Sequence, residues 1–416
     1  MSTYTTSESV TEGHPDKVCD QISDAILDAY LARDPLARVA VETMVSGNTV
    51  HIAGEVTAQA HVEIAPLVRG VLREIGYDDP ALGFDAEGCF ILTDLHEQSP
   101  DIAQGVSRST ALGAGDQGVF YGYACDETVS LMPAAIHYAH RLTETLAAAR
   151  HEGRLPWLRP DGKAQVTFRN DADGQPCELT SLVLSTQHAE AVPREEMVRG
   201  LLAEVIVPVM GPWLRHDTRV LINPTGRFVR GGPGADTGVT GRKIMVDTYG
   251  GIGRHGGGAF SGKDATKVDR TAAYMARYIA KTVVAAGLAR SCEVSLAFAI
   301  GQFLPEMIDV KIHPECGIDV DTLAQVIREV FPLSVSGMIE TLDLRRPNFR
   351  RTASYGHFGR ENEGFRWEWT DRTSALRSAL ERAAARNGTS ICRKSLSRCN
   401  GRDVRPTAPA ESVWQI

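Results

Sequence analysis

Residues 256–264 have the sequence Gly-Gly-Gly-Ala-Phe-Ser-Gly-Lys-Asp, and the part from Gly257 to Lys263 fits the G-x-x-x-x-G-K pattern of phosphate-binding loops. In a nucleoside triphosphatase, the next residue is a Ser or Thr whose hydroxyl holds magnesium. Here it is Asp264, whose carboxylate would repel phosphates. A P-loop is therefore disfavoured. A glycine loop followed by a lysine still offers backbone amides and positive charge to a phosphate.

Just upstream, residues 251–256 match the dinucleotide fingerprint G-x-G-x-x-G. That fingerprint requires a strand before it, a helix after it and an acidic residue about 20 positions further on. Residues 247–250 (Asp-Thr-Tyr-Gly) are instead turn-like, and residues 257–259 (Gly-Gly-Ala) are poor material for a helix start. A Rossmann dinucleotide site is disfavoured as well.

The wider segment from Asn223 to Arg270 is basic and rich in glycine. It contains eight Lys or Arg, four Asp and thirteen of the 39 glycines, in a chain whose net charge is −8. Cations gathered so densely would repel one another unless an anion lay among them. Basic side chains combined with exposed amides therefore indicate a polyanionic ligand.

A long helix is predicted from about residue 267 to 286. Lys263, Lys267 and Arg270 follow an i, i+4, i+7 spacing, so they would line one side of its N-terminus if the turn extends back to Lys263. The helix dipole would add its positive end there. Asp269 fits two interpretations, a capping box with Thr266 and a magnesium ligand.

Three other stretches, at residues 12–17, 113–118 and 160–163, also suit a nucleotide and its phosphates. In the first, Pro15 suits the first position of a helix and Asp16 its first turn. His14 either caps that helix or contacts a ligand. Asp16 either favours the helix dipole or joins Asp269 in binding magnesium. The residues alone leave both questions open.

The apolar periodicity predicts strands followed by helices three times along the chain, which indicates an α+β protein with three domains of similar plan. The expected limits are 3–100, 112–230 and 231–385, with a mobile loop from about 98 to 118 and a disordered tail at 387–416. One predicted helix begins at Pro15 and is stopped by Asp34-Pro35, and the others are 64–75, 133–150, 194–209, 267–286 and 320–330. The predicted strands are 39–45, 50–55, 164–169, 179–185, 219–222, 293–300 and 307–312.

The overall composition excludes several classes of protein. Hydrophobic residues make up 43% of the chain and charged residues 23%, which is ordinary for a globular protein. The acidic balance argues against a general nucleic-acid binder. The eight cysteines are scattered without a Cys-x-x-Cys pair, so neither a disulfide framework nor a thiolate zinc site is expected. With no signal peptide and no run of roughly 20 apolar residues, a cytoplasmic protein with no membrane partner is expected.

Several motifs together resemble the methionine adenosyltransferase family, also called S-adenosylmethionine synthetases. The ATP motif of that family is matched by Gly-Asp-Gln-Gly at 115–118, and its glycine-rich phosphate motif by residues 256–264. Residues 7–17, 98–102 and 355–360 also resemble it. The likeness covers about residues 3–372. The tail after Arg386 has no counterpart in the family.

The resemblance implies three similar α+β domains about a pseudo-threefold axis, in a homodimer or a homotetramer whose active sites lie between two chains. The implied reaction joins ATP, L-methionine and water to give S-adenosylmethionine, pyrophosphate and orthophosphate. In it, the methionine sulfur attacks C5′ of the ribose and the tripolyphosphate is then hydrolysed. A non-catalytic partner of the same fold is the alternative, but it should have lost His14, Lys163 or Lys263.

The resemblance also assigns roles to residues. The catalytic residues would be His14, Lys163, Arg242 and Lys263. ATP would be bound by His14, Asp116, Asp161, Lys163, Arg227, Phe228, Asp236, Arg242, Lys243, Ala259 and Lys263. Methionine would be bound by Glu55, Gln98, Asp236 and Lys267. Two Mg²⁺ ions per site would be bound through Asp16 and Asp269, and K⁺ through Glu42.

Overall fold

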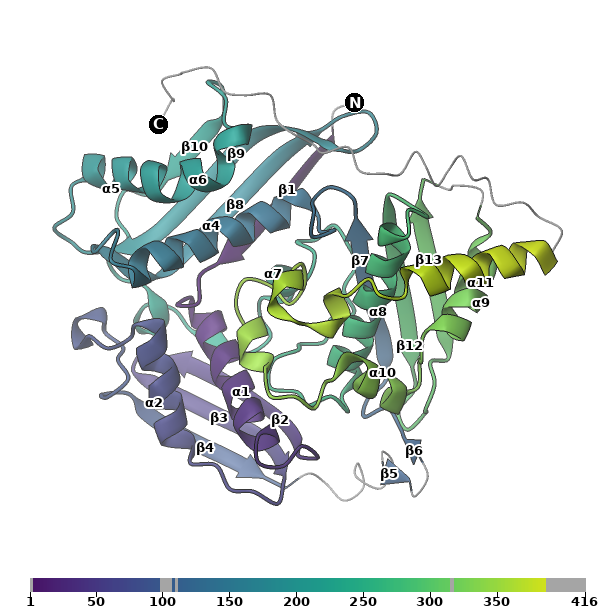
Figure 1. Cartoon of the computed structure of the whole chain (residues 1–416). Coiled ribbons are helices and arrows are strands. Elements are labelled where there is room, and N and C mark those ends of the chain that lie inside the picture. Colours follow the sequence, from purple (N-terminus) through teal and green to yellow (C-terminus); the bar gives the residue numbers. More distant parts are fainter. Residues whose placement is uncertain (1–2, 98–106, 109–110, 315–317, 387–416) are drawn as a thin grey trace.

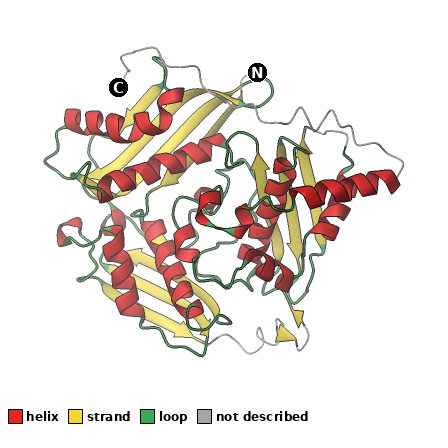
Figure 2. Cartoon of the chain, in the orientation of Figure 1, coloured by secondary structure: helices red, strands yellow, loops and turns green. Residues whose placement is uncertain are grey.

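The structure is a computed structural model that describes residues 3–97, 107–108, 111–314 and 318–386. This part of the chain contains three main sheets, each carrying helices on one face (Figures 1 and 2). The sheets surround a central region of loops that includes the short helix α7 (Ile244–Asp247). The predicted architecture of three α+β domains is confirmed. Gln98, residues 98–106 and 109–110 of the expected mobile loop, and the tail at 387–416 lie outside the described residues.

The three sheets are named here by their main domain. The N-terminal sheet has the order β11 (Gly238–Val239), β2 (Arg38–Ser46), β3 (Thr49–Thr57) and β4 (Phe90–His96). The central sheet has the order β1 (Thr3–Val10), β8 (Leu158–Asn170), β9 (Pro176–His188) and β10 (Arg219–Ile222). The C-terminal sheet has the order β13 (Met307–His313), β12 (Ser291–Phe298) and β7 (Gly118–Cys125). A small separate pair is formed by β5 (Ser107–Arg108) and β6 (Ala111–Leu112).

Each sheet packs against its own helices. The N-terminal sheet carries α1 (Pro15–Leu31) and α2 (Ile64–Ile75). The central sheet carries α4 (Ala134–His151), α5 (Arg194–Leu201) and α6 (Val207–Met210). The C-terminal sheet carries α8 (Val268–Ala285) and α9 (Val320–Val330), while α10 (Val335–Leu342) packs against α8, and α11 (Thr373–Arg386) packs against α8 and α9. Among the described helices, none is long and apolar enough to cross a membrane.

Each sheet also takes one strand from a distant part of the chain. The first strand, β1, pairs antiparallel with β8 of the central sheet rather than with its neighbours in sequence. Strand β7 pairs with β12 of the C-terminal sheet, and β11 pairs with β2 of the N-terminal sheet. The domain limits 3–100, 112–230 and 231–385 stay a prediction, and hydrogen-bonded strands cross all of them.

Local sequence explains several element boundaries. Helix α1 begins at Pro15, which needs no N–H partner in the first turn, as predicted. The hairpin of β2 and β3 turns at Gly47, whose φ of +57° suits glycine. Helix α2 ends at Gly76, which has a left-handed φ of +101°. The predicted helices 64–75 and 320–330 have the same bounds as α2 and α9.

Other elements differ from the prediction. The helix expected at 194–209 is broken into α5, a π-helical turn at Leu202–Ile206 and α6, because Pro208 has no N–H to continue the helical ladder. The patterns also missed β1, whose buried positions include the polar Ser7 and Ser9. Also missed were β4, β7, α10 and α11.

Two apolar cores hold the molecule together. The larger one joins the N-terminal and C-terminal sheets through α1 and α8, and the smaller one lies between the central sheet and α4 to α6. Helix α8 is buried at every position from Val268 to Val284. Its backbone lies so close to β7 that a Cβ added to Gly122 would overlap the main chain at Ala276 and Arg277.

Gly122→Ala is expected to lower the free energy of unfolding by about 1–3 kcal/mol, because α8 must move away from β7 to admit one methyl group. The matched control is Gly70→Ala in α2, where an added Cβ meets nothing within 4 Å. That change should be neutral or stabilising by up to about 1 kcal/mol, since alanine favours helix. Urea unfolding measures both. Equal effects of the two substitutions would contradict this close packing.

Candidate active site

The N-terminus of α1 presents His14 as its cap. The backbone N–H of Asp16 donates to His14 Nδ1 at 3.2 Å, so Nδ1 is an acceptor and the proton of the neutral ring is on Nε2. The side chain is buried. Burial, and then the charges of Lys243 and Lys163, lower the pKa of His14 to about 3. His14 is thus a neutral ring with a free Nε2–H donor.

Asp16 connects this cap to the segment that carries Arg242 and Lys243. Its Oδ1 accepts from the backbone N–H of Val239 at 3.0 Å, and its Oδ2 accepts from Lys243 Nζ at 2.7 Å. Arg242 Nε lies 3.7 Å from Asp16 Oδ1. Although burial opposes it, the hydrogen bonds from Lys243 and Val239 hold the pKa of Asp16 below its usual value. The carboxylate therefore stays ionised among the cations.

Strand β8 adds Asp161 and Lys163 to the same place. Lys163 pairs in register with Val10, the last residue of β1, and its exposed side chain is close enough to His14 to lower the pKa of that ring. Asp161 is buried and accepts from the backbone N–H of Gly232 at 2.9 Å. Burial raises its pKa to about 6. The residues His14, Asp16, Asp161, Lys163, Arg242 and Lys243 are called the first cluster.

A second cluster lies at the start of α8. Lys263 Nζ donates to Asp269 Oδ2 at 2.7 Å, and Lys267 pairs with Asp264. The backbone of Lys263 forms a bridge with Ala40, which pairs in turn with Glu55 on β3. The residues Glu55, Lys263, Asp264, Lys267 and Asp269 are called the second cluster.

Two possibilities that the sequence left open are not realised in this region. Helix α8 begins at Val268, so Lys263 is not on its first turn, because Asp264 is bonded to the backbone N–H groups of Val39 and Thr266 and fixes a turn there. The capping box is not formed either. Lys267 occupies the N-cap without a side-chain bond, and Asp269 pairs with Lys263.

Arg270 does not belong with the ligand-facing cations. It is fully buried and binds both oxygens of Asp24 on α1, at 2.7 and 2.9 Å. Its partner lies 246 residues away in sequence, so helical spacing could not reveal the pair. The guanidinium is an internal tie between α8 and α1.

The other predicted residues lie around these clusters or apart from them. Asp116 and Asp236 are exposed, and each accepts from the next backbone N–H. Arg227 is exposed and pairs with Glu190, while the backbone of Phe228 is bonded to His188. Ala259 packs against Gly241. Glu42 projects from the exposed face of the N-terminal sheet, and Glu55 lies 3.4 Å from His96 on the same sheet.

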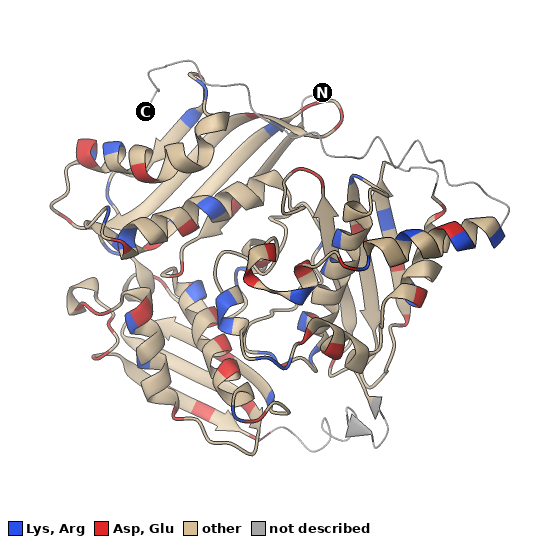
Figure 3. Cartoon of the chain, in the orientation of Figure 1, with Lys and Arg blue, Asp and Glu red and all other residues tan. Residues whose placement is uncertain are grey.

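No hydrogen bond or ion pair joins side chains of the first cluster to those of the second among the described residues. Both clusters nevertheless belong to the central region between the three sheets, where Figure 3 shows Lys and Arg gathered on loops and helix ends. Within one chain the two clusters are separate, and they are connected through α1 and through the contact of Ala259 with Gly241.

The other aspartates of α1 also belong to this region, although sequence motifs did not point to them. Asp20 and Asp24 are fully buried, and their oxygens accept from the backbone N–H groups of Gly241 and Gly262, at 2.9 and 2.8 Å. Asp28 does the same for Phe349 and Arg350. The signal was present as an aspartate at every fourth position from 16 to 28.

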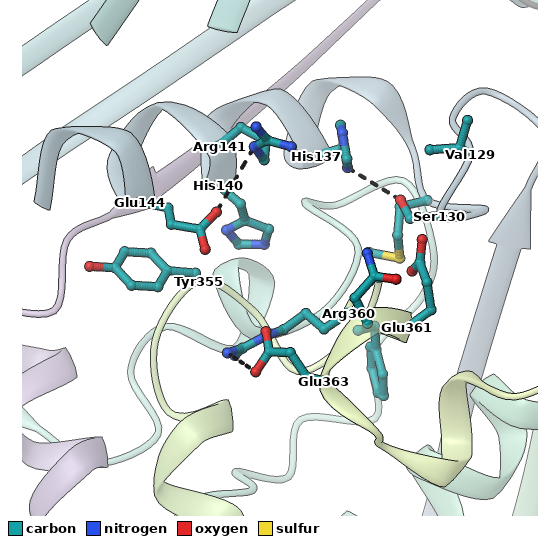
Figure 4. Close-up of a pocket in the computed structure, with 14 residues that line it drawn as sticks. Val129, Ser130, His137, His140, Arg141, Glu144, Tyr355, Arg360, Glu361 and Glu363 are labelled. Carbon is teal, nitrogen blue, oxygen red and sulfur yellow. Dashed lines mark hydrogen bonds and ion pairs between the residues drawn. The ribbon is translucent and has the colours of Figure 1, made fainter. Parts of the chain in front are cut away.

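A cavity of about 340 Å³ lies outside both clusters, between α4 and the segment 355–363 (Figure 4). Apolar and mixed-charge side chains line it, and one of them, Tyr355, has a left-handed φ of +63°. His140 Nε2 and the Tyr355 hydroxyl have no hydrogen-bond partner, but both atoms are closed off from solvent. A molecule in the cavity could not reach them without displacing the wall.

Comparisons with known proteins agree with this geometry. Family models described as S-adenosylmethionine synthetase match the N-terminal domain at residues 2–100, the central domain at 111–228 and the C-terminal domain at 230–369. The chain is 70% identical over 373 residues to S-adenosylmethionine synthase 1 of Rhodospirillum rubrum, covering 90% of this chain and 97% of that protein. It is 66% identical over 371 residues to S-adenosylmethionine synthase 1 of Rhodopseudomonas palustris, covering 89% and 97%.

His140 gives a pH test of the buried imidazoles. Burial, and then the neighbouring charges of His137, Lys17 and Arg360, lower its pKa to about 3, so the folded chain resists a proton that the unfolded chain accepts near pH 6.5. Stability is then lost as pH falls below 6.5. The difference in free energy of unfolding between wild type and His140→Gln should therefore fall by about 2 kcal/mol from pH 7 to pH 5, to the disadvantage of wild type. Urea unfolding at both pH values, with the exposed His61→Gln as control, measures it. A constant difference would refute the neutral buried ring.

Proposed function

The chain belongs to the S-adenosylmethionine synthetase family, and we infer from this membership that it is a methionine adenosyltransferase. It transfers the adenosyl group of ATP to L-methionine, forming S-adenosylmethionine and releasing pyrophosphate and orthophosphate. The observation that carries this conclusion for the present chain is the pair of charged clusters with every expected acidic and basic position retained. Nothing supports the alternative of a non-catalytic partner.

The chemistry needs no nucleophile from the protein. The thioether of methionine attacks C5′ of the ribose, and tripolyphosphate departs with the electrons of the broken C–O bond. What the protein must supply is alignment of sulfur with carbon and stabilisation of the negative charge on the leaving group. Preorganised cations and hydrogen-bond donors accomplish this at little reorganisation cost.

We propose that His14 acts at the reacting oxygen. Its Nδ1 is occupied by the backbone N–H of Asp16, so its Nε2–H is the group available to the substrate. A neutral donor there would stabilise charge on the oxygen that leaves C5′. Lys163, Arg242, Lys243 and Lys263 would hold the remaining phosphate oxygens.

A divalent metal ion and potassium are general cofactors of the family. We propose Mg²⁺ for the divalent ion, two per site, held through Asp16 and Asp269. The described residues contain no group of three or more metal-ligating side chains, which suits an ion bound by one carboxylate with phosphate oxygens and water as its other ligands. Bound there, the metal would neutralise phosphate charge. Each carboxylate already lies beside a lysine of the same cluster. K⁺ would bind through Glu42.

The remaining substrate contacts are proposed for residues within the two clusters and around them. We propose that Asp116, Asp161, Arg227, Phe228 and Ala259 lie along ATP. Asp236 would contact both ATP and methionine. Glu55, Gln98 and Lys267 would complete the methionine site. The proximity of Glu55 to Lys263, through Ala40, supports placing methionine next to the phosphates.

We further propose that the active site is completed by a second copy of the chain, in a homodimer or a homotetramer. Within one chain, the two clusters do not contact one another through hydrogen bonds or ion pairs of their described side chains. The face of the N-terminal sheet away from its helices also leaves Met44, Phe90 and Leu92 exposed. Large apolar side chains exposed on one face of a sheet are common at oligomer interfaces.

We propose a cytoplasmic location. The five cysteines in the described part of the chain, Cys19, Cys89, Cys125, Cys177 and Cys292, are all free. Unpaired buried thiols are typical of a reducing compartment. Neither nucleic acid nor membrane is proposed as a partner.

His14→Asn should lower kcat by about 10²–10³-fold while the KM for ATP changes only a few-fold, because the donor acts mainly in the transition state. The asparagine oxygen can still accept from the N–H of Asp16, so the helix cap is preserved. The assay supplies ATP, methionine, magnesium and potassium and measures the sulfonium product and free phosphate. An unchanged kcat would remove His14 from the mechanism, and wild type without sulfonium product would refute the function.

Subunit mixing tests the shared site. His14→Asn and Lys263→Ala should each be nearly inactive, yet co-refolded mixtures should recover about a quarter of wild-type activity. Half of the dimers are then mixed, and each has one site with His14 and Lys263 both intact. Mixing His14→Asn with Lys243→Ala is the control, because both changes affect the first cluster and no intact site can form. Recovery in neither mixture would place both clusters in a site within one chain.

A further inference from the structure

Helix α1 carries four aspartates at a constant spacing of four residues, Asp16, Asp20, Asp24 and Asp28. Residues four apart lie on one side of a helix, about 6 Å apart along its axis. Asp16, Asp20 and Asp24 are buried, and Asp28 is half-buried. This row of carboxylates, called the aspartate ladder, is costly to bury and must be bonded along its length.

Each rung of the ladder accepts a backbone N–H from a segment distant in sequence, which is a loop for Asp20 and Asp24. Asp16 accepts from Val239 at 3.0 Å, Asp20 from Gly241 at 2.9 Å and Asp24 from Gly262 at 2.8 Å. Asp28 accepts from two consecutive residues, 349 and 350, at 2.9 Å each. The order of the four aspartates along α1 is the same as the order of their partner residues along the chain.

The middle two rungs hold the loops that carry the cations. Gly241 directly precedes Arg242 and Lys243, and Gly262 directly precedes Lys263. Both glycines have left-handed backbones, with φ of +77° and +80°, and an added Cβ would overlap Ala259 in one case and Val41 in the other. Because glycine has no side chain, each loop is held at this point by the hydrogen bond from its backbone N–H to the aspartate.

The second oxygens of these two aspartates are occupied by buried cations. Asp20 Oδ2 accepts from Lys17 Nζ at 3.0 Å, and Asp24 Oδ2 accepts from Arg270 at 2.9 Å. Lys17 also pairs with Asp247, and Arg270 also binds the hydroxyl of Tyr274 at 3.0 Å. These bonds restrict rotation of each carboxylate, so the oxygen that accepts from the loop amide is held in place.

We propose that Asp20 and Asp24 are positioning residues for adenosyl transfer: Asp20 fixes the loop that carries Arg242 and Lys243, and Asp24 fixes the loop that carries Lys263. This role rests on the proposed function of those cations as tripolyphosphate ligands. Neither aspartate touches the substrate. Each acts through the backbone amide of the loop that it binds, at Gly241 for Asp20 and at Gly262 for Asp24. Helix α1 is therefore the common support of both loops.

Asp20→Ala tests the proposal, because Lys17 keeps Asp247 as a partner, whereas removing Asp24 would leave Arg270 unpaired and buried. The variant should lose on the order of 10²-fold in kcat through misplacement of the cations. It should also weaken the binding of inorganic tripolyphosphate, measured by calorimetry without methionine. Asp20→Asn should restore both to within a few-fold, because its amide oxygen still accepts from Gly241.

The matched control is Asp28→Ala, which removes a rung of the same ladder that holds residues 349 and 350. It should lower the melting temperature without lowering kcat more than about twofold. Equal losses of kcat in Asp20→Ala and Asp28→Ala would overturn the proposal, and so would an Asp20→Asn variant as inactive as alanine.

If Asp20→Ala does not fold, Asp20→Glu decides the question. It keeps a negative charge beside Lys17 but moves the acceptor by one methylene, so the proposal expects a lower kcat. Wild-type kcat would mean that Asp20 only neutralises Lys17, and would overturn the proposal. Wild-type enzyme is assayed alongside. If wild type and Asp20→Ala are equally active, the positioning role is refuted and the proposed function stands. If wild type itself is inactive, the proposed function is refuted.

Discussion

Positive charge can be concentrated in a folded chain only where carboxylates offset its repulsion, and this constraint shapes the centre of the molecule. Lys243 pairs with Asp16 and Lys263 pairs with Asp269, both at 2.7 Å. The two aspartates lie in the first turns of α1 and α8, where a negative charge also favours the helix dipole. The free enzyme can therefore hold the cations proposed to bind tripolyphosphate in place before any phosphate arrives.

The exchange of strands between sheets brings these cations and carboxylates together. Strand β1 lies in the central sheet and ends opposite Lys163, so the chain that leads to His14 starts beside that lysine. Strand β11 lies in the N-terminal sheet, and its Val239 bonds to Asp16 just before Arg242 and Lys243. Without these two exchanges, the three segments of the first cluster would belong to three separate domains. The fold's least regular feature is thus what assembles the site.

The sequence predicted those features that depend on local pattern. Helices α2 and α9 follow from apolar periodicity and strand β10 from its short apolar run, and their bounds were correct. Strand β1 was missed because polar Ser7 and Ser9 occupy its buried side. Arg270 was misassigned because its partner Asp24 comes from the other end of the chain. Likewise, the turn that Asp264 fixes before α8 depends on Val39, so spacing alone could not place Lys263. Motifs identified the family, whereas pairing across the chain determined which cations face the ligand.

His14 shows why two interpretations of one residue need not compete. As a helix cap, its Nδ1 accepts from the N–H of Asp16, and this bond fixes the tautomer that leaves a proton on Nε2. Burial and the charges of Lys243 and Lys163 keep the ring neutral. A neutral imidazole can donate a hydrogen bond to the departing oxygen without adding to the repulsion among the cations around it. In the proposed mechanism, the permanent charges of lysine and arginine would hold the outer phosphates, where most of the negative charge resides. Capping the helix is therefore what prepares the histidine to act as a donor.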